Sequence, residues 1–81
     1  MLMIIENLTD ENVAEVLRAM TYMEWVSVEE RVQLRMAGYI VLSQGGSFYN
    51  LARKGKWLLV RYYPEALIRL AENTARVVAN N

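Results

Sequence analysis

The chain contains neither cysteine nor histidine. Without cysteine there is no disulfide framework and no thiol nucleophile, and without either residue the usual ligands of zinc, haem and iron–sulfur centres are missing. A Ser–His–acid triad is excluded for the same reason. The neighbouring carboxylates Glu29 and Glu30 diverge around a helix and do not converge on one bond. We therefore expect a protein that is not an enzyme and that holds no metal or cofactor.

Long apolar runs are also missing from the chain. None approaches the roughly 18 residues that a membrane span requires. The opening MLMII is apolar, but it is short, no basic region precedes it, and Glu6 follows it, so it lacks the form of a signal peptide. Residues 2–5 are instead expected to form a short strand or an arm on the core. Together with the absence of cysteine, this predicts a cytoplasmic protein that does not contact membranes.

The small size of the chain limits its stability. Eighty-one residues are expected to form one domain, residues 1–81, and a domain of this size buries only about 60–65% of its unfolded surface. Apolar residues make up 54% of the chain, which favours a surface patch that a partner covers. With disulfides and metals excluded, self-association is the remaining common source of stability, and we expect a homodimer.

The charges balance over the whole chain but are divided unequally along it. Residues 1–30 contain seven acids and one base, whereas residues 31–63 contain no acid and six bases: Arg31, Arg35, Arg53, Lys54, Lys56 and Arg61. Two interpretations stay open at this point. The basic segment can face outward toward a polyanion, or it can face the acidic segment, within one chain or across a dimer.

An amphipathic helix is predicted at residues 10–21. Thr9 is a cap residue, and Asp10 and Glu11 follow it in the first turn, where the helix dipole favours negative charge. Apolar residues then recur at helical spacing on one face: Val13, Val16, Leu17 and Met20. The connection that follows contains Tyr22 and Trp25, which we expect to fill the core because large aromatic residues supply much of the burial in a small domain.

A second helix is predicted at residues 28–37. Ser27 and Glu30 have the spacing of a capping box, and Gly38 is suited to the left-handed conformation that often ends a helix. Within this segment Arg31 and Arg35 lie beside a narrow apolar stripe, which consists of Val28, Val32 and Met36.

A β-hairpin and further helices are predicted in the second half. The segments 39–42 (YIVL) and 48–51 (FYNL) have strand composition, and the intervening SQGGS contains a Gly–Gly turn signal. Helical spacing returns at Arg53, and Pro64 suits the first turn of a last helix, whose face consists of Leu67, Leu70, Ala71, Thr74 and Val78. The predicted fold is α+β and mostly helical, with two helices, a hairpin, and one or two C-terminal helices.

Residues 34–59 resemble the segment of winged helix-turn-helix proteins that runs from the recognition helix through the wing. The phrase that ends the recognition helix is matched by Leu34, Gly38, Tyr39 and Ile40. The phrase that follows the wing is matched by Tyr49, Leu51, Lys54, Gly55, Leu58 and Leu59. The match covers about a third of the chain and implies a winged-helix-like fold.

The resemblance implies a dimeric, transcription-regulator-like protein that binds DNA. In that family a helix enters the major groove and the wing contacts phosphates beside it. The last two helices would pair with a second copy. Carried onto this chain, the DNA-binding positions are Arg31, Arg35, Gln44, Gly45, Gly46, Ser47, Arg53, Lys54 and Lys56.

A different function stays open beside DNA binding. The family has three helices before the wing, whereas only two are predicted here, so the N-terminal strand or a C-terminal helix would replace the third. Glu29 and Glu30 open the presumed reading helix, and no Lys or Arg lies at the wing tip. The alternative is a protein-interaction module, such as a small adaptor or inhibitor from a phage or mobile element, that docks through its acidic first helix.

The aromatic residues allow two interpretations. Aromatic side chains beside basic ones can stack on the bases of a single strand, or they can belong to the core or to a dimer interface. The set consists of Tyr22, Trp25, Phe48, Tyr49, Trp57, Tyr62 and Tyr63.

Overall fold

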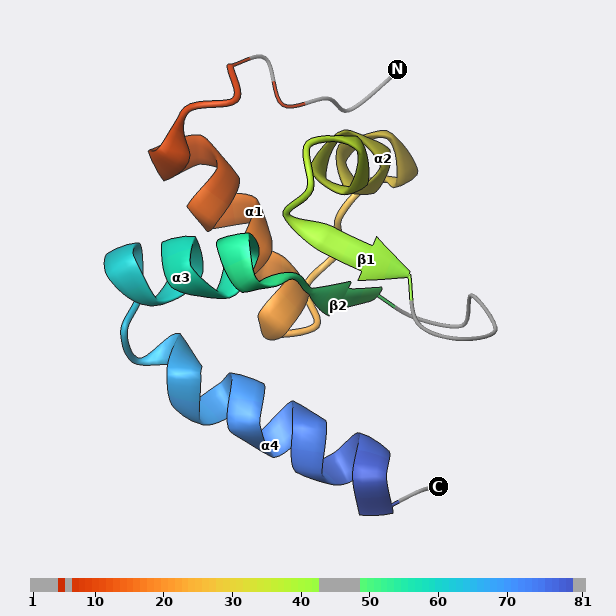
Figure 1. The fold of residues 1–81 in the computed structure, drawn as a ribbon, viewed down its shortest axis with the longest axis vertical. Helices are drawn as coiled ribbons and strands as arrows, with labels where there is room; N and C mark the ends of the chain where they lie inside the picture. The colour runs from red at the N-terminus through yellow and green to blue at the C-terminus, as the bar shows by residue number, and fades with distance from the viewer. Residues whose placement is uncertain (1–4, 6, 43–48, 80–81) are drawn as a thin grey trace.

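Four helices and one two-stranded hairpin make up the described part of the chain. The structure is a computed structural model, and it describes residues 5, 7–42 and 49–79. The elements are α1 (Asp10–Thr21), α2 (Val28–Met36), β1 (Ile40–Leu42), β2 (Tyr49–Leu51), α3 (Arg53–Tyr62) and α4 (Ala66–Ala79) (Figure 1). The predicted mostly helical α+β fold, in the order helix, helix, hairpin, helix, helix, is confirmed.

Local capping signals explain where the first two helices begin and end. The Thr9 hydroxyl accepts a hydrogen bond from the backbone N–H of Asn12, at 3.2 Å, and so caps α1. Ser27 and Glu30 form the predicted capping box at the start of α2. Gly38 follows α2 with φ +86°, a conformation that favours glycine because a Cβ is strained there.

The hairpin pairs Ile40 with Leu51, Val41 with Asn50 and Leu42 with Tyr49 in an antiparallel register. Side chains alternate between the two faces of a strand, so Ile40 is buried in the core while Val41 and Asn50 are exposed. The strand β1 begins one residue later than predicted, whereas β2 agrees with the prediction over residues 49–51, and Phe48 lies outside the described residues. The predicted turn between them also lies outside the described residues.

The core lies between α1, α2, α3 and the inner face of the hairpin. Its largest fully buried side chains are Val13, Leu17, Leu34, Ile40 and Leu59. The helix α3 packs more extensively against α1 than against any other element, and Figure 1 shows the two crossing in the middle of the molecule. A third core helix is therefore supplied after the hairpin rather than before it. This layout of helices and hairpin is compatible with that of a winged helix.

The N-terminal arm is fastened to α2 by one side chain. The Gln33 carboxamide donates to the carbonyl of Ile5 at 3.1 Å and accepts from its backbone N–H at 2.8 Å. Ile5 is buried against the core, which agrees with the expected arm. It belongs to no strand, however, and residues 2–4 of the predicted strand lie outside the described residues.

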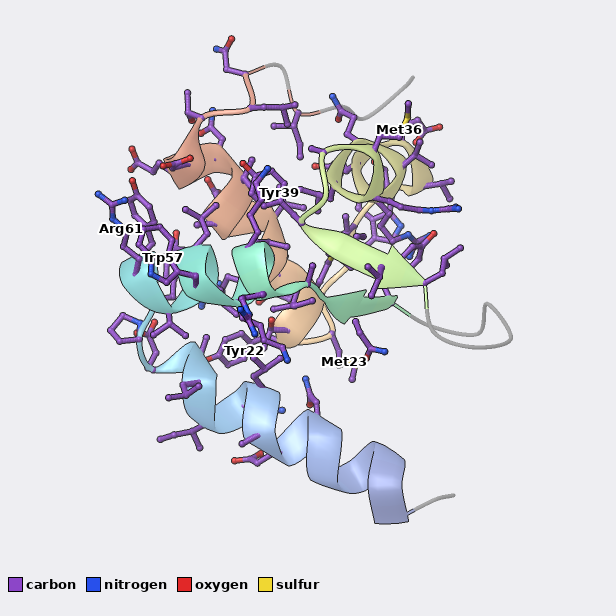
Figure 2. The ribbon with its side chains drawn as sticks, in the orientation of Figure 1. Tyr22, Met23, Met36, Tyr39, Trp57 and Arg61 are labelled. Carbon is purple, nitrogen blue, oxygen red and sulfur yellow. The ribbon has the colours of Figure 1, made fainter. Side chains whose placement is uncertain are left out.

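Polar contacts hold α4 to the end of α1. The Tyr22 ring has two guanidinium groups near it, with Cζ of Arg18 at 5.0 Å and Cζ of Arg69 at 5.3 Å from its centroid. The Asn73 side-chain amide donates to the carbonyl of Thr21 at 2.9 Å. Figure 2 shows Tyr22 where α4 approaches the end of α1. These contacts stabilise the α1–α4 junction.

Several apolar residues face outward, and for Trp25 and Leu67 this is contrary to expectation. Trp25 was expected in the core, but it is 73% exposed because the next residue, Val26, takes the buried position. On α4, Ala66 is buried instead of the predicted Leu67, which is exposed together with Ile68. The apolar stripe of α2 is exposed as well: Val28, Val32 and Met36.

No helix in residues 5, 7–42 and 49–79 is long and apolar enough to cross a membrane. Within the same ranges there is no group of three or more acidic side chains that could hold a metal ion.

Candidate nucleic-acid interface

Lys54 contributes to packing at the start of α3. Its ammonium group donates to the carbonyl of Ala37 at 2.9 Å and lies 4.3 Å from the centroid of the Tyr39 ring. Since Ala37 is the C-cap of α2, this cation neutralises a helix end whose carbonyls carry partial negative charge. Lys54 thus ties α3 to the end of α2, and a phosphate would compete with that contact.

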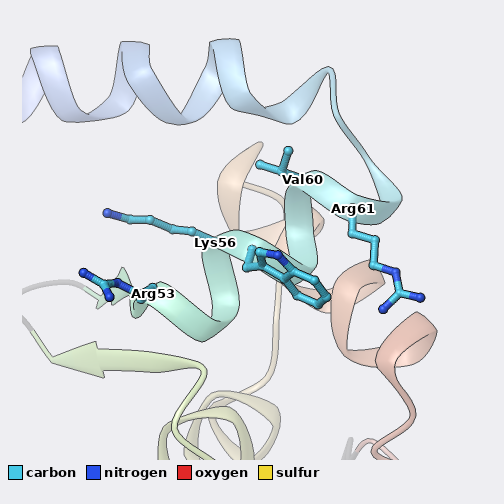
Figure 3. A pocket seen from close by; sticks show the side chains of 5 residues that line it. Arg53, Lys56, Val60 and Arg61 are labelled. Carbon is cyan, nitrogen blue, oxygen red and sulfur yellow. The ribbon is translucent and has the colours of Figure 1, made fainter.

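Arg53, Lys56, Trp57, Val60 and Arg61 line a shallow open depression on α3 (Figure 3). The opposite face of the helix is buried through Gly55, Leu58 and Leu59, so the helical period directs these five residues outward. In Figure 3, Arg53 and Lys56 extend to one side of the depression and Arg61 extends to the other. The Arg61 guanidinium Cζ lies 5.4 Å from the Trp57 ring centroid. We call this set the α3 face.

The two arginines of α2 differ in their surroundings. Arg31 is half-buried and its Cζ lies 5.7 Å from the centroid of the Tyr49 ring, so it connects α2 to β2. Its Nε is buried without a hydrogen-bond partner among the described residues. Arg35 is exposed on the last turn, beside the exposed apolar stripe of α2. Figure 2 shows Met36, the last residue of that stripe, on the outer side of α2.

Of the two acidic residues in the first turn of α2, Glu29 and Glu30, the second takes part in capping the helix. The Glu30 carboxylate accepts from the backbone N–H and from the hydroxyl of Ser27, at 3.1 and 2.9 Å. Glu30 therefore completes the cap of α2 and is drawn toward the protein backbone. The wing-tip positions Gln44, Gly45, Gly46 and Ser47 lie outside the described residues.

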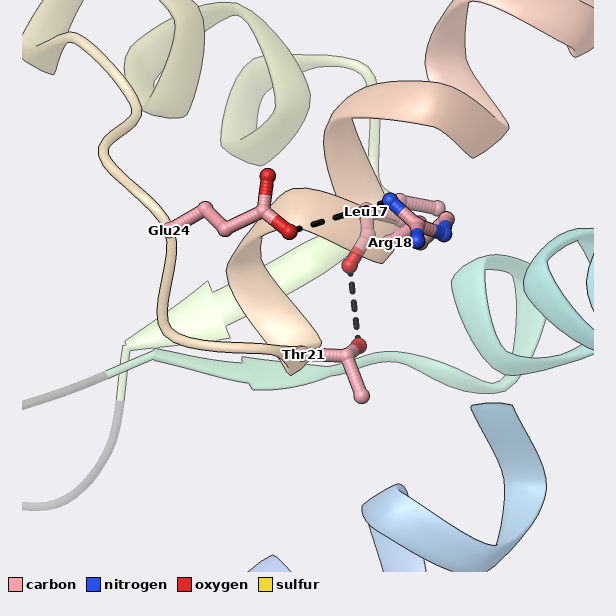
Figure 4. Close-up of polar contacts among 4 residues, drawn as sticks. All are labelled: Leu17, Arg18, Thr21 and Glu24. Carbon is pink, nitrogen blue, oxygen red and sulfur yellow. Dashed lines mark hydrogen bonds and ion pairs between the residues drawn. The ribbon is translucent and has the colours of Figure 1, made fainter. Parts of the chain in front are cut away.

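The acidic and basic segments form no ion pair with each other in the described part of the chain. The ion pairs found there are Arg18 with Glu24, at 3.7 Å, and Arg69 with Glu72, at 3.8 Å. Figure 4 shows the first, beside the hydrogen bond from the Thr21 hydroxyl to the carbonyl of Leu17. Both pairs lie outside the basic segment 31–63. Its six cations are thus not neutralised by described acids of the same chain.

Arg61 and Trp57 were not among the DNA-binding positions expected from the sequence, although a signal for them existed. Positions 53, 56, 57, 60 and 61 follow the i, i+3, i+4, i+7, i+8 pattern of one helix face. Applying the helical period to the basic residues would have grouped Arg61 with Arg53 and Lys56, and would have separated Lys54 from them.

Comparisons with protein-family models, with curated proteins and with solved structures found no match to this chain. The assignment of a function therefore rests on the geometry of these side chains.

Proposed function

We propose that the protein binds duplex DNA, mainly through contacts to phosphates, as a small winged-helix-like and dimeric regulator. Arg53 and Lys56 of the α3 face carry the main contacts, and Arg35 extends the basic surface onto α2. Lys54 and Arg31 act chiefly in packing. Phosphate contacts of this kind fix position and affinity and carry no direct sequence information.

One observation carries this proposal: the basic segment has no acidic partner among the described residues. The side chains of Arg35, Arg53 and Lys56 are exposed and form no ion pair, hydrogen bond or ring contact with any described residue. The clustering of Arg53 and Lys56 on one helix turn concentrates positive potential on one surface. Two cations near a helix N-terminus also oppose the helix dipole, a local cost that an external anion offsets.

The test is fluorescence anisotropy with a labelled blunt duplex of mixed sequence, titrated at low and at physiological salt. We expect binding that weakens steeply with salt, because each phosphate contact releases counterions. Lys56→Gln should weaken binding by roughly fivefold at low salt, the equivalent of about 1 kcal/mol for one charged contact. Its matched control is Asn7→Asp, which changes the net charge equally at an exposed position before α1. Equal losses in both variants, or no binding at low salt, would contradict the proposal.

The dimer is part of the same proposal and rests on the exposed face of α4. Leu67 and Ile68 are exposed on a helix whose first residue, Ala66, is buried and whose Asn73 donates to the end of α1. Figure 1 shows α4 along one edge of the molecule, where a second copy can reach it. Pairing of two such helices buries both apolar faces, which offsets the small core of each chain.

A protein-docking function is the second candidate, and the exposed acids of α1 favour it. Asp10, Glu11 and Glu15 are exposed and form no ion pair with a described residue. A surface of this kind could dock on a basic protein partner, as an adaptor or an inhibitor would. Glu15→Gln separates the two candidates, because it should leave duplex affinity unchanged or slightly higher, whereas it should weaken capture of a basic partner.

A further inference from the structure

The least explained feature of the α3 face is an aromatic ring left in solvent. Trp57 is 63% exposed, while the apolar residues that follow it, Leu58 and Leu59, are buried in the core. A tryptophan can bury a large apolar area on folding, but most of the Trp57 side chain stays in contact with solvent. Its ring contact within the described residues is with the Arg61 guanidinium, whose Cζ lies 5.4 Å from the ring centroid. A role in recognition accounts for this placement better than a role in packing.

The surroundings of the ring define the chemistry of its ligand. On this face Arg53 lies four residues before Trp57, Lys56 directly before it and Arg61 four residues after it. From Arg53 to Arg61 the helix rises by roughly 12 Å, so cations flank the ring along the helix axis. A matching ligand carries a flat group for the indole and anionic groups on both sides. An unpaired nucleotide within a strand has this arrangement, with a base between two phosphates.

We propose that the α3 face binds single-stranded nucleic acid by stacking one base on Trp57 and holding the adjacent phosphates with Arg53, Lys56 and Arg61. The proposal rests on the proposed function and extends it, since Arg53 and Lys56 contact duplex phosphates there, whereas Arg61 is added here. It adds that the protein prefers DNA with an unpaired extension over blunt duplex. Stacking of bases on aromatic side chains beside cations is tolerant of sequence.

An anionic membrane surface is the competing ligand, and the structure favours it less. Membrane-surface helices bury a broad apolar face in the interface. In α3 the apolar face is already buried against the core through Leu58 and Leu59. On the α3 face the apolar side chains are Trp57 and the half-buried Val60, and Tyr62 is exposed at the end of the helix, outside this set. One ring among three cations fits a single base better than it fits a lipid interface.

The first experiment measures affinity for a labelled single-stranded oligonucleotide of mixed sequence beside the blunt duplex. Trp57→Leu removes the ring but keeps an apolar side chain, and we expect a loss of roughly tenfold in single-strand affinity. Trp57→Phe keeps a stacking surface and should stay within about threefold of the native protein. The matched control is Trp25→Leu, which removes an equally exposed indole beside the acidic Glu24. Duplex affinity should change less than about twofold in all three variants.

The second experiment observes the stack directly. In a Trp25→Phe background the remaining indole is Trp57, and stacking on a base should quench its fluorescence as the oligonucleotide is added. Vesicles of phosphatidylcholine and phosphatidylserine serve as the competing ligand. Quenching by the oligonucleotide supports the proposal. Quenching by vesicles alone overturns it in favour of a membrane surface.

The outcomes separate this proposal from the function on which it rests. Duplex binding without single-strand binding overturns the base-stacking site and leaves the proposed function standing. Single-strand binding that depends on Trp57, without duplex binding, supports the site and contradicts the duplex function. Equal single-strand loss in the Leu and Phe variants, or no loss in either, refutes stacking. Absence of binding to both nucleic acids overturns both proposals.

Discussion

Replacing Gly55 with alanine should destabilise the protein, because α3 begins in direct contact with the backbone of Tyr39. A Cβ at position 55 would lie 2.2 Å from the carbonyl oxygen of Tyr39, whereas real Cβ contacts essentially never fall below 3.0 Å. The helix would have to move by about 0.8 Å, the difference between these distances. That oxygen cannot easily move away, since it accepts a hydrogen bond from the backbone N–H of Ala52 at 3.0 Å.

The size of the effect follows from two opposed contributions. Overpacking of a buried site costs about 1–3 kcal/mol, and a clash with backbone lies at the upper end because no rotamer relieves it. Alanine recovers up to about 1 kcal/mol through its higher helix propensity. We therefore expect a net loss of about 2 kcal/mol. For a chain of this size that lowers Tm by roughly 10 °C, a large fraction of the ~5 kcal/mol typical of a small domain.

Thermal and urea denaturation followed by circular dichroism provide the assay, with Gly38 as the control. Gly38 has open space for a Cβ but φ +86°, so its strain is conformational rather than steric. Gly38→Ala should cost about 1 kcal/mol, and Gly38→Asn should recover part of that loss, because asparagine tolerates the left-handed region. If Gly55→Ala instead proves more stable than the native protein, helix propensity dominates and the close approach of α3 to Tyr39 is refuted.

Three further variants test other contacts. Lys54→Met should lower stability by about 1 kcal/mol, through loss of its Ala37 hydrogen bond and ring contact, whereas Lys56→Met should leave urea denaturation unchanged. Gln33→Ala should lower the free energy of unfolding by about 1–2 kcal/mol and increase proteolysis of the N-terminal arm, because the N–H and carbonyl of Ile5 lose their partner. Unchanged cleavage would contradict the role of Gln33 in holding the arm to α2. Ile68→Glu should shift the protein from dimer to monomer in light scattering, whereas Val32→Glu on α2 should not. An unchanged molecular mass for Ile68→Glu would show that the dimer interface does not include this face of α4.

The parts of the fold that were predictable from the sequence are those determined by neighbouring residues. Thr9 and Ser27 cap helices because their hydroxyls reach backbone N–H groups three residues away. Gly38 ends α2 for an equally local reason, its positive φ. Such signals operate within one helical turn, so the order and the bounds of the elements could be predicted closely. The sequence left two candidates to replace the third core helix, the N-terminal strand or a C-terminal helix, and could not decide between them.

The burial of individual aromatic residues was not predictable in the same way. Trp25 and Val26 are both suited to a core, and the tertiary packing of α1 and α2 decides which of the two turns inward. The two hydrogen bonds between Gln33 and Ile5 join residues 28 positions apart, and no local sequence pattern predicts them. In the candidate site, positions 54 and 56 are both lysine and lie only two residues apart. Only the placement of the Ala37 carbonyl separates the packing residue from the exposed one.

This separation has a consequence for the salt dependence of DNA binding. The six cations of residues 31–63 divide into two groups by what they contact. Three stack on rings or donate a hydrogen bond within the described part of the chain: Arg31, Lys54 and Arg61. The other three are exposed and make no such contact there: Arg35, Arg53 and Lys56. Only the second group can bind phosphate without first giving up an existing partner.

The slope of log affinity against log salt counts the phosphates that are neutralised, at about −0.9 for each contact with duplex DNA. Three free cations predict a slope of about −3 per chain, and all six would give about −5. The measurement is a series of duplex titrations between low and physiological salt, normalised to the stoichiometry of the complex. In Lys54→Met the slope should stay the same, whereas in Lys56→Met it should become shallower by about one. A native slope near −5 that flattens equally in both variants would show that Lys54 leaves Ala37 to contact DNA, and the division between packing and binding cations would fail.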